Sequence, residues 1–214
     1  MRKSFKYWTR QEIKKNFHLT QSDSIPPLQE WIEVADITLS ESEMNYLNHL
    51  LKRSLRYVDR WNETELREKF IIKIIELVDF EFEDLNCHSF AERYLSAQVG
   101  DYTLYGYADW LVATGSQFPE VPFFFIHQYK PEGAKDIDGR GQLLATMLAT
   151  NTLHKNTSPI FGTFVVGRLW FFLALEGLSF AETSAFDVLK IDDLYQVVKI
   201  LKKQKSIILK KLKG

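Results

Sequence analysis

The feature that most constrains this chain is a change in the spacing of its apolar residues, from helical in the first third to strand-like near residue 90. After Ser40 and after Asn62, apolar residues recur at the three- and four-residue spacing of helices that bury one face. Tyr102–Thr114 and Val121–Tyr129 are instead rich in aromatic and β-branched residues, which is typical of buried strands. The chain therefore combines helices with a sheet.

Capping boxes mark where the early helices begin. In this motif a polar residue precedes a glutamate by three positions, and each side chain bonds the other residue's backbone N–H. The three pairs are Thr9 and Glu12, Ser40 and Glu43, and Asn62 and Glu65. Each pair predicts a helix N-terminus.

The predicted element order is helices, three strands, a helix, two strands and a closing helix. After the strands that start near Phe90, a polar loop is expected over 133–141, a helix over 142–153, strands over 159–166 and 169–175, and a last helix from Ile191. This order predicts an α/β fold in which a mixed central sheet is flanked by helices. We expect an N-terminal helical extension over residues 1–58 and one α/β domain with a C-terminal helix over 59–214; two tightly fused subdomains are the alternative.

Composition limits the partners and the compartment. The chain has 27 Lys and Arg against 28 Asp and Glu, so any contact with nucleic acid needs a local basic patch. The single cysteine, Cys87, fits a reducing compartment, and we expect a cytoplasmic protein. The most apolar segment, 169–175, is too short to cross a bilayer, so no membrane partner is expected. Oligomeric state is left open, with a homodimer as one option.

One group of polar residues interrupts the predicted strands. Asp109 is a lone carboxylate in an otherwise apolar strand, a placement that costs free energy unless another group pairs with it. In the next strand, Gln128 and Lys130 are two residues apart, so they point to one face while His127 and Tyr129 point to the other. A carboxylate, an amide and an ammonium group therefore converge at one strand edge.

This convergence has a chemical interpretation. A hard divalent cation such as Mg²⁺ prefers oxygen ligands, which Asp109 and Gln128 offer, and Glu63 at the start of a helix is a natural additional carboxylate. Such a metal polarises a phosphodiester and acidifies a bound water, and Lys130 would orient that water or stabilise charge on the phosphate.

These residues resemble the PD-(D/E)XK nuclease superfamily, whose element order is helix with Glu, strand, strand with Asp, strand with (E/Q)-x-K, helix, strand. The matching segments are 62–67, 106–109, 128–130 and 141–144, within a resemblance that spans about 60–175. It is also similar to uncharacterised bacterial proteins that carry this core behind a helical N-terminal segment. The resemblance implies a restriction-endonuclease-like core and cleavage of DNA with Mg²⁺ or Mn²⁺. It implies that Asp109 and Gln128 are metal ligands, that Lys130 is the catalytic lysine, and that Gln142 contacts phosphate or a metal-bound water.

One departure from the family pattern opens an alternative function. Where the superfamily most often has glutamate, this chain has Gln128, which keeps an oxygen ligand but removes a charge. The sequence therefore predicts a metal-dependent deoxyribonuclease and, as the alternative, a catalytically impaired nuclease-fold module that binds nucleic acid or protein. A structural partner protein of a larger complex is a third option.

Simpler interpretations stand beside these. Asp109 and Lys130 could form a structural ion pair, and His127 could be a buried histidine with its hydrogen bonds satisfied. The seven lysines between 199 and 213 could be a phosphate-binding stripe or a solvated helix face. Tyr105 and Tyr107 share a strand face with Asp109 and could line a substrate cleft or simply cover the sheet.

Overall fold

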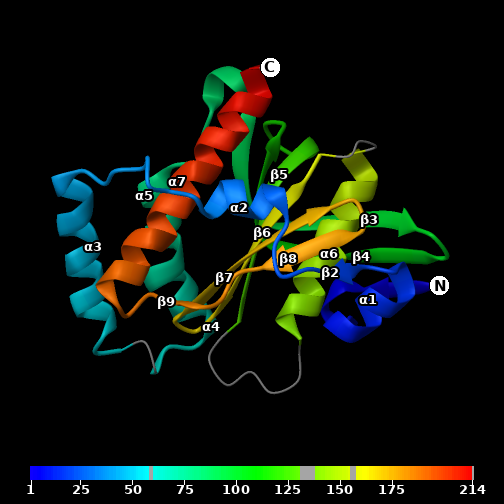
Figure 1. Ribbon diagram of the computed structural model, residues 1–214, viewed down its shortest axis with the longest axis horizontal. Helices are drawn as coiled ribbons and strands as arrows, with labels where there is room; N and C mark the ends of the chain where they lie inside the picture. The colour runs from blue at the N-terminus through cyan, green and yellow to red at the C-terminus, as the bar shows by residue number, and fades with distance from the viewer. Residues whose placement is uncertain (58–59, 131–137, 155–157, 214) are drawn as a thin grey trace.

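A computed structural model describes residues 1–57, 60–130, 138–154 and 158–213 (Figure 1). Its helices are α1 (Arg10–Phe17), α2 (Pro26–Ile32), α3 (Glu41–Ser54), α4 (Glu63–Leu66), α5 (Ile72–Val78), α6 (Gly139–His154) and α7 (Ile191–Lys213). Its strands are β1 (Arg2–Ser4), β2 (Thr20–Gln21), β3 (Cys87–Val99), β4 (Tyr102–Thr114), β5 (Glu120–Lys130), β6 (Ile160–Val166), β7 (Leu169–Glu176), β8 (Ser179–Glu182) and β9 (Phe186–Asp187). Short turns of helix are η1 (Phe5–Tyr7), η3 (Arg67–Ile71) and η4 (Glu83–Leu85).

The strands form one mixed sheet with helices on both faces. Along the sheet, β3, β4 and β5 are antiparallel neighbours, β5 and β6 are parallel, and β6 and β7 are antiparallel. The parallel pair requires a crossover connection, which α6 provides. The expected fold class is therefore confirmed. The order α4, β3, β4, β5, α6, β6 is the one that the nuclease resemblance implies, so the architecture is consistent with a restriction-endonuclease-like core.

Two hydrophobic clusters fill the space between the sheet and its helices. One face packs against α2, α3, α5 and α7, with Trp31 of α2 in edge-to-face contact with Phe125, Phe161 and Phe172 of the sheet. The opposite face packs against α1 and α6. Both clusters are continuous with residues from the first 57 positions, because those residues supply the buried apolar stripes of α1, α2 and α3.

The first 57 residues also contribute two short strands. β1 pairs with β4 and β2 pairs with β8, both in parallel register. The segment therefore contributes strands to the central sheet as well as helices that pack on it. The division at residue 58 remains a prediction, and residues 58 and 59 lie outside the described residues.

The predicted helix starts are confirmed in atomic detail. Thr9 and Ser40 each accept a hydrogen bond from the N–H of the glutamate three residues on, whose side chain accepts the cap residue's own N–H. Asn62 and Glu65 make the same reciprocal pair, at 2.9 and 3.2 Å.

The expected loop over 133–141 is partly wrong. Residues 133–137 lie outside the described residues, but α6 begins at Gly139, three residues earlier than predicted. Asp138 explains the earlier start, because its carboxylate accepts the N–H of Gly141 at 3.2 Å and so acts as an N-cap. The short strands β8 and β9 were not predicted.

No helix in the described part of the chain is long and apolar enough to span a membrane. The cytoplasmic location remains a prediction.

Candidate functional site: a notch at one edge of strand β4

The candidate site lies in a gap between two strands, β1 and β5, which pair with different parts of the same edge of β4. β1 pairs with residues 103–105 of β4, and β5 pairs with residues 110–114 along the same edge. Neither strand pairs with residues 106–109. The sheet therefore has a notch at Gly106–Asp109, which places the carboxylate of Asp109 at the point where the ladder with β5 begins.

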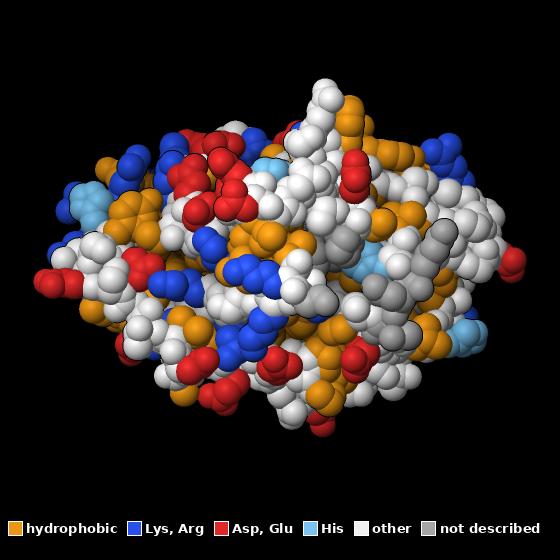
Figure 2. Space-filling view, turned by 90° about the horizontal axis from the view of Figure 1, so that it is seen from above, with side chains coloured by type: hydrophobic (Ala, Val, Ile, Leu, Met, Phe, Trp, Pro, Cys, Tyr) orange, Lys and Arg blue, Asp and Glu red, His pale blue; other side chains and the backbone are white. Residues whose placement is uncertain are grey.

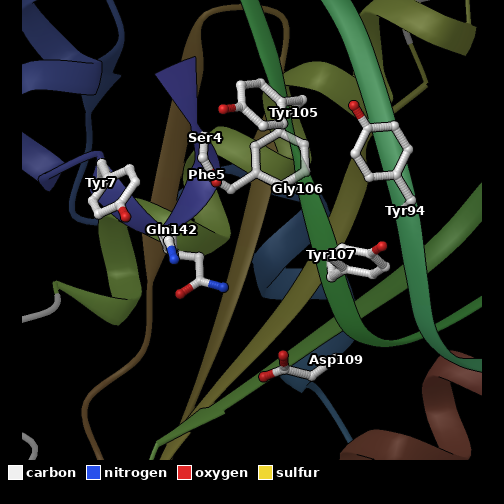
Figure 3. A pocket seen from close by; sticks show the side chains of 10 residues that line it. Ser4, Phe5, Tyr7, Tyr94, Tyr105, Gly106, Tyr107, Asp109 and Gln142 are labelled. Atoms are coloured by element: carbon white, nitrogen blue, oxygen red, sulfur yellow. The ribbon is translucent and has the colours of Figure 1, made fainter.

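This notch opens into a cavity of about 380 Å³, seen closely in Figure 3. Its lining comes from four separate segments: residues 4–7, Tyr94 of β3, residues 105–107 together with Asp109 of β4, and Gln142 of α6. The volume is within the range of about 300–1,000 Å³ for small-molecule sites. The suggestion that Tyr105 and Tyr107 line a cleft together with Asp109 agrees with this cavity.

Gly106 makes the notch possible. Its φ of +152° is a conformation that residues with a Cβ rarely adopt, and a Cβ there would lie 2.8 Å from the ring of Phe5. Phe5 can therefore pack directly on β4 as the chain leaves β1 and turns through η1. The N-terminal segment forms one wall of the cavity as a result.

Asp109 is half-buried and bonded to the neighbouring strand. The backbone N–H of Tyr129 donates to Oδ2 of Asp109 at 3.0 Å. Trp110 pairs with His127, so Asp109 and Gln128 each lie one residue beyond that pair, at the same level of the two strands. The structure thus brings the predicted acid next to the predicted Gln-x-Lys segment.

Gln128 departs from a simple ligand geometry. Its side chain is fully buried and does not line the cavity, and neither amide atom has a hydrogen-bond partner among the described residues. A buried amide without partners costs about 1–3 kcal/mol. Sequence alternation correctly placed this residue next to Asp109, but it gave no sign of the burial.

Lys130 is half-buried and is the last residue of β5. The structural ion pair with Asp109 that was considered from the sequence stays a prediction. Its backbone carbonyl accepts the N–H of Gly167 at 2.9 Å, which fixes the end of the strand.

Gln142 enters the cavity from α6. It lies in the first turn of that helix and is 6% exposed, and its Oε1 is buried with no partner among the described residues. Figure 3 shows its side chain on the opposite side of the cavity from Tyr107. The structure therefore places Gln142 and Asp109 on one cavity.

The two glutamates of the first predicted helix turn differ. The backbone of Glu63 begins α4, but its side chain lies outside the described residues, so its predicted role as a ligand stays a prediction. Glu65 completes the capping box with Asn62 and forms an ion pair with Lys69 at 2.6 Å.

Arg67 is a supporting residue whose role was not predicted from the sequence. Its Nη1 donates to the hydroxyl of Tyr129 at 3.0 Å and pairs with Glu92 at 2.7 Å. Burial raises the pKa of Tyr129 to about 12, although the hydrogen bond from Arg67 opposes that shift. Arg67 therefore holds the side chain of Tyr129, while the backbone N–H of Tyr129 holds Asp109.

The available donors fit an oxygen-ligated cation by type. Asp109 offers a carboxylate, and the buried Oε1 atoms of Gln128 and Gln142 lack hydrogen-bond partners among the described residues. Oxygen ligands suit Mg²⁺ or Mn²⁺. Within the same residues, no group of three His, Cys, Asp or Glu side chains is close enough to hold a metal. Among these three candidate ligands, Asp109 supplies the carboxylate and the two glutamines supply amide oxygens.

The lysines of α7 do not form a continuous phosphate-binding stripe. Lys202 pairs with Glu43 at 2.7 Å and Lys203 with Asp36 at 3.1 Å. The face in Figure 2 likewise carries acidic and basic side chains next to one another. This arrangement favours the solvated helix face.

Comparisons with known proteins add little. No protein-family model matches the chain, and no curated protein sequence matches it significantly. A solved cryo-EM structure of a DrdV–DNA complex aligns with 74% of this chain at 16% sequence identity, with a TM-score of 0.41. The aligned region spans only 13% of that much longer chain. Similarity at this level assigns neither function nor site residues.

Proposed function

We propose that this protein is a divalent-metal-dependent nuclease that hydrolyses DNA phosphodiester bonds at the notch of β4. The observation that carries the proposal is the hydrogen bond from the Tyr129 N–H to Asp109, because it fixes a carboxylate beside the Gln128-x-Lys130 segment. This is the combination of groups that the nuclease resemblance implies, and its carboxylate lines the cavity.

Each residue has a proposed role. Asp109 and Gln128 would hold Mg²⁺ or Mn²⁺, with Glu63 as a further ligand. When bound, the metal would polarise the phosphate and lower the pKa of a water molecule. Lys130 would stabilise negative charge developing on the phosphate, and Gln142 would donate its amide N–H to a phosphate oxygen across the cavity.

The roles of Asp109 and Lys130 can be tested by cleavage assays. We expect purified protein to degrade DNA with Mg²⁺ or Mn²⁺, and Asp109→Asn and Lys130→Gln each to reduce the rate by about 100-fold or more. The first removes a carboxylate that would bind the metal, and the second removes the charge that would stabilise the reacting phosphate. Asp101→Asn and Lys15→Gln make the same chemical changes at exposed positions and should leave the rate unchanged. Cleavage that survives both Asp109→Asn and Lys130→Gln contradicts the assignment.

A second candidate is a nuclease-fold module that binds nucleic acid or protein without cutting. The full burial of Gln128, away from the cavity, favours it. The variant Gln128→Glu distinguishes the metal-dependent nuclease from the non-cutting module. A nuclease should bind Mn²⁺ more tightly or cleave faster with the added carboxylate, as titration and cleavage assays would show. Salt-sensitive DNA binding with no cleavage in either protein supports the non-cutting module.

A further inference from the structure

We propose that the notch cavity takes unpaired nucleotides of single-stranded DNA, whose bases stack on the exposed tyrosines of β3 and β4. The inference rests on the proposed function for its choice of DNA, and it names the form of the substrate. It concerns binding, which can be measured without cleavage.

Three tyrosines form an aromatic surface beside Asp109. Tyr94 and Tyr107 are directly paired across β3 and β4, with ring centroids 5.6 Å apart, and Tyr105 lies 6.4 Å from Tyr94. Tyr94 is 46% exposed and Tyr107 is 60% exposed, so these rings are not part of the core. Exposed aromatic rings on a strand are the usual platform on which single-stranded nucleic acids stack their bases.

Tyr105, Tyr107 and the carboxylate of Asp109 all come from β4. Tyr105 and Tyr107 are two residues apart and share one face of β4. The alternation breaks near Asp109, because Ala108 and Leu111 both belong to the cluster packed against α1 and α6. The two tyrosines and Asp109 line the same cavity, and Figure 3 shows both rings beside the strand that carries Asp109. A strand of DNA whose bases stack on the tyrosines would bring its next phosphate toward Asp109.

Two cations lie over tyrosines that line the cavity, without an acidic partner among the described residues. The guanidinium of Arg2 is 4.4 Å from the centre of the Tyr105 ring and donates to the Tyr94 hydroxyl at 3.1 Å. Lys6 Nζ is 4.8 Å from the centre of the Tyr7 ring. Within the described part of the chain neither forms an ion pair, whereas the neighbouring Lys3 pairs with Glu12. Their charge is therefore available to phosphates.

The dimensions favour an unpaired strand over a duplex. The cavity, of about 380 Å³, is bounded by residues 4–7 on one side and by β4 on the other. It can accept one nucleotide at a time. In a duplex the faces of the bases are already stacked on each other, and exposing them costs free energy that a single strand does not have to supply.

Binding measurements in EDTA test the proposal. A fluorescent oligothymidine and a duplex of the same length are titrated with the full chain, and fluorescence anisotropy gives the two dissociation constants. We expect the single strand to bind more tightly. Tyr107→Ala should weaken its binding about fivefold or more, because one stacked base is lost, whereas Tyr107→Trp should preserve it. Tyr46→Ala, at an exposed tyrosine of α3, should have no effect.

The cations are tested through salt dependence. Lys6→Gln and Arg2→Gln should each reduce the slope of log affinity against log salt by about 0.7, the value for one phosphate of a single strand. Equal binding of duplex and single strand, or equal effects of Tyr107→Ala and Tyr46→Ala, overturns the proposal. Tight single-strand binding without any cleavage would leave it standing while the nuclease function fails. Cleavage of duplex DNA with no preference for the single strand would support the nuclease function and overturn the single-strand proposal.

Discussion

His127 is a buried histidine with no hydrogen bond from either ring nitrogen to any described residue. The sequence suggested a buried histidine whose hydrogen bonds are satisfied; the burial is correct and the satisfaction is not. Its ring instead lies among aromatic side chains, with centroids 5.3 Å from Trp170 and 5.9 Å from Tyr129. Burial lowers the pKa of His127 to about 3, so the ring is neutral near pH 7.

This burial predicts a pH-dependent stability. In the unfolded chain the histidine takes up a proton below its ordinary pKa of 6.5, but in the folded protein it does so only near pH 3. The free energy of unfolding should therefore fall by up to about 1.4 kcal/mol per pH unit as the pH drops from 6.5 toward 3. His154, whose pKa burial lowers to about 4, acts in the same direction.

The variant His127→Leu should reduce that pH dependence without abolishing it, because His154 remains. At pH 7 its stability should be unchanged or higher, since two buried polar atoms without partners are removed. Urea unfolding at pH 7 and pH 5 measures both effects. Replacing the exposed His49 by glutamine serves as the control. An equal pH dependence in wild type and His127→Leu would show that the buried ring does not resist protonation.

At the scale of elements, the capping boxes show how local chemistry fixes where helices begin. The Ser40 hydroxyl accepts the N–H of Glu43 at 3.2 Å, and the Glu43 carboxylate accepts the N–H of Ser40 at 2.7 Å. Glu43 also pairs with Lys202, so the start of α3 is tied to α7. The cap therefore supports both a helix and a helix–helix contact.

Ser40→Ala should lower the free energy of unfolding by about 1 kcal/mol, because one N–H at the start of α3 loses its acceptor. Ser206→Ala makes the same chemical change at an exposed position inside α7, where alanine is the better helix former, and it should be neutral or slightly stabilising. Chemical unfolding of the two variants gives the comparison. A loss of similar size in both would mean that the cap contributes nothing specific.

At the scale of the whole molecule, Gly141 joins the N-terminal segment to α6. A Cβ at this position would overlap the backbone of Trp8, Thr9 and Arg10, which cannot rotate away as a side chain can. Because residues 4–7 form a wall of the cavity, this contact also sets the shape of the candidate site.

Gly141→Ala should destabilise the protein by about 1–3 kcal/mol despite the higher helix propensity of alanine, because the backbone contact is overpacked. Thr152→Ala, at an exposed position of the same helix, is the control and should be nearly neutral. Thermal unfolding followed by circular dichroism measures the difference. A Gly141→Ala protein as stable as wild type would show that the N-terminal segment is not held against α6.

The sequence by itself determined most of the longer elements, whereas the short strands β8 and β9 and the first residues of α6 were not predicted. Aromatic and β-branched content predicted β4 as Tyr102–Thr114, apolar periodicity predicted the start of α7 near Ile191, and cap chemistry predicted the starts of α1 and α3. These signals are local, since each depends on residues a few positions apart. The same residue content placed Asp109 and the Gln128-x-Lys130 segment on strands, and alternation put Gln128 and Lys130 on one face.

Tertiary structure alone decided how these pieces surround a site. The pairing of β1 with β4 joins residues about 100 positions apart, and only that pairing turns an edge of β4 into a notch. It also decided that Gln128 is buried and that Tyr94 lies across from Tyr107. Such contacts depend on which distant segments pack together, and the free energy that selects them is summed over the whole core, so no local pattern in the sequence encodes them.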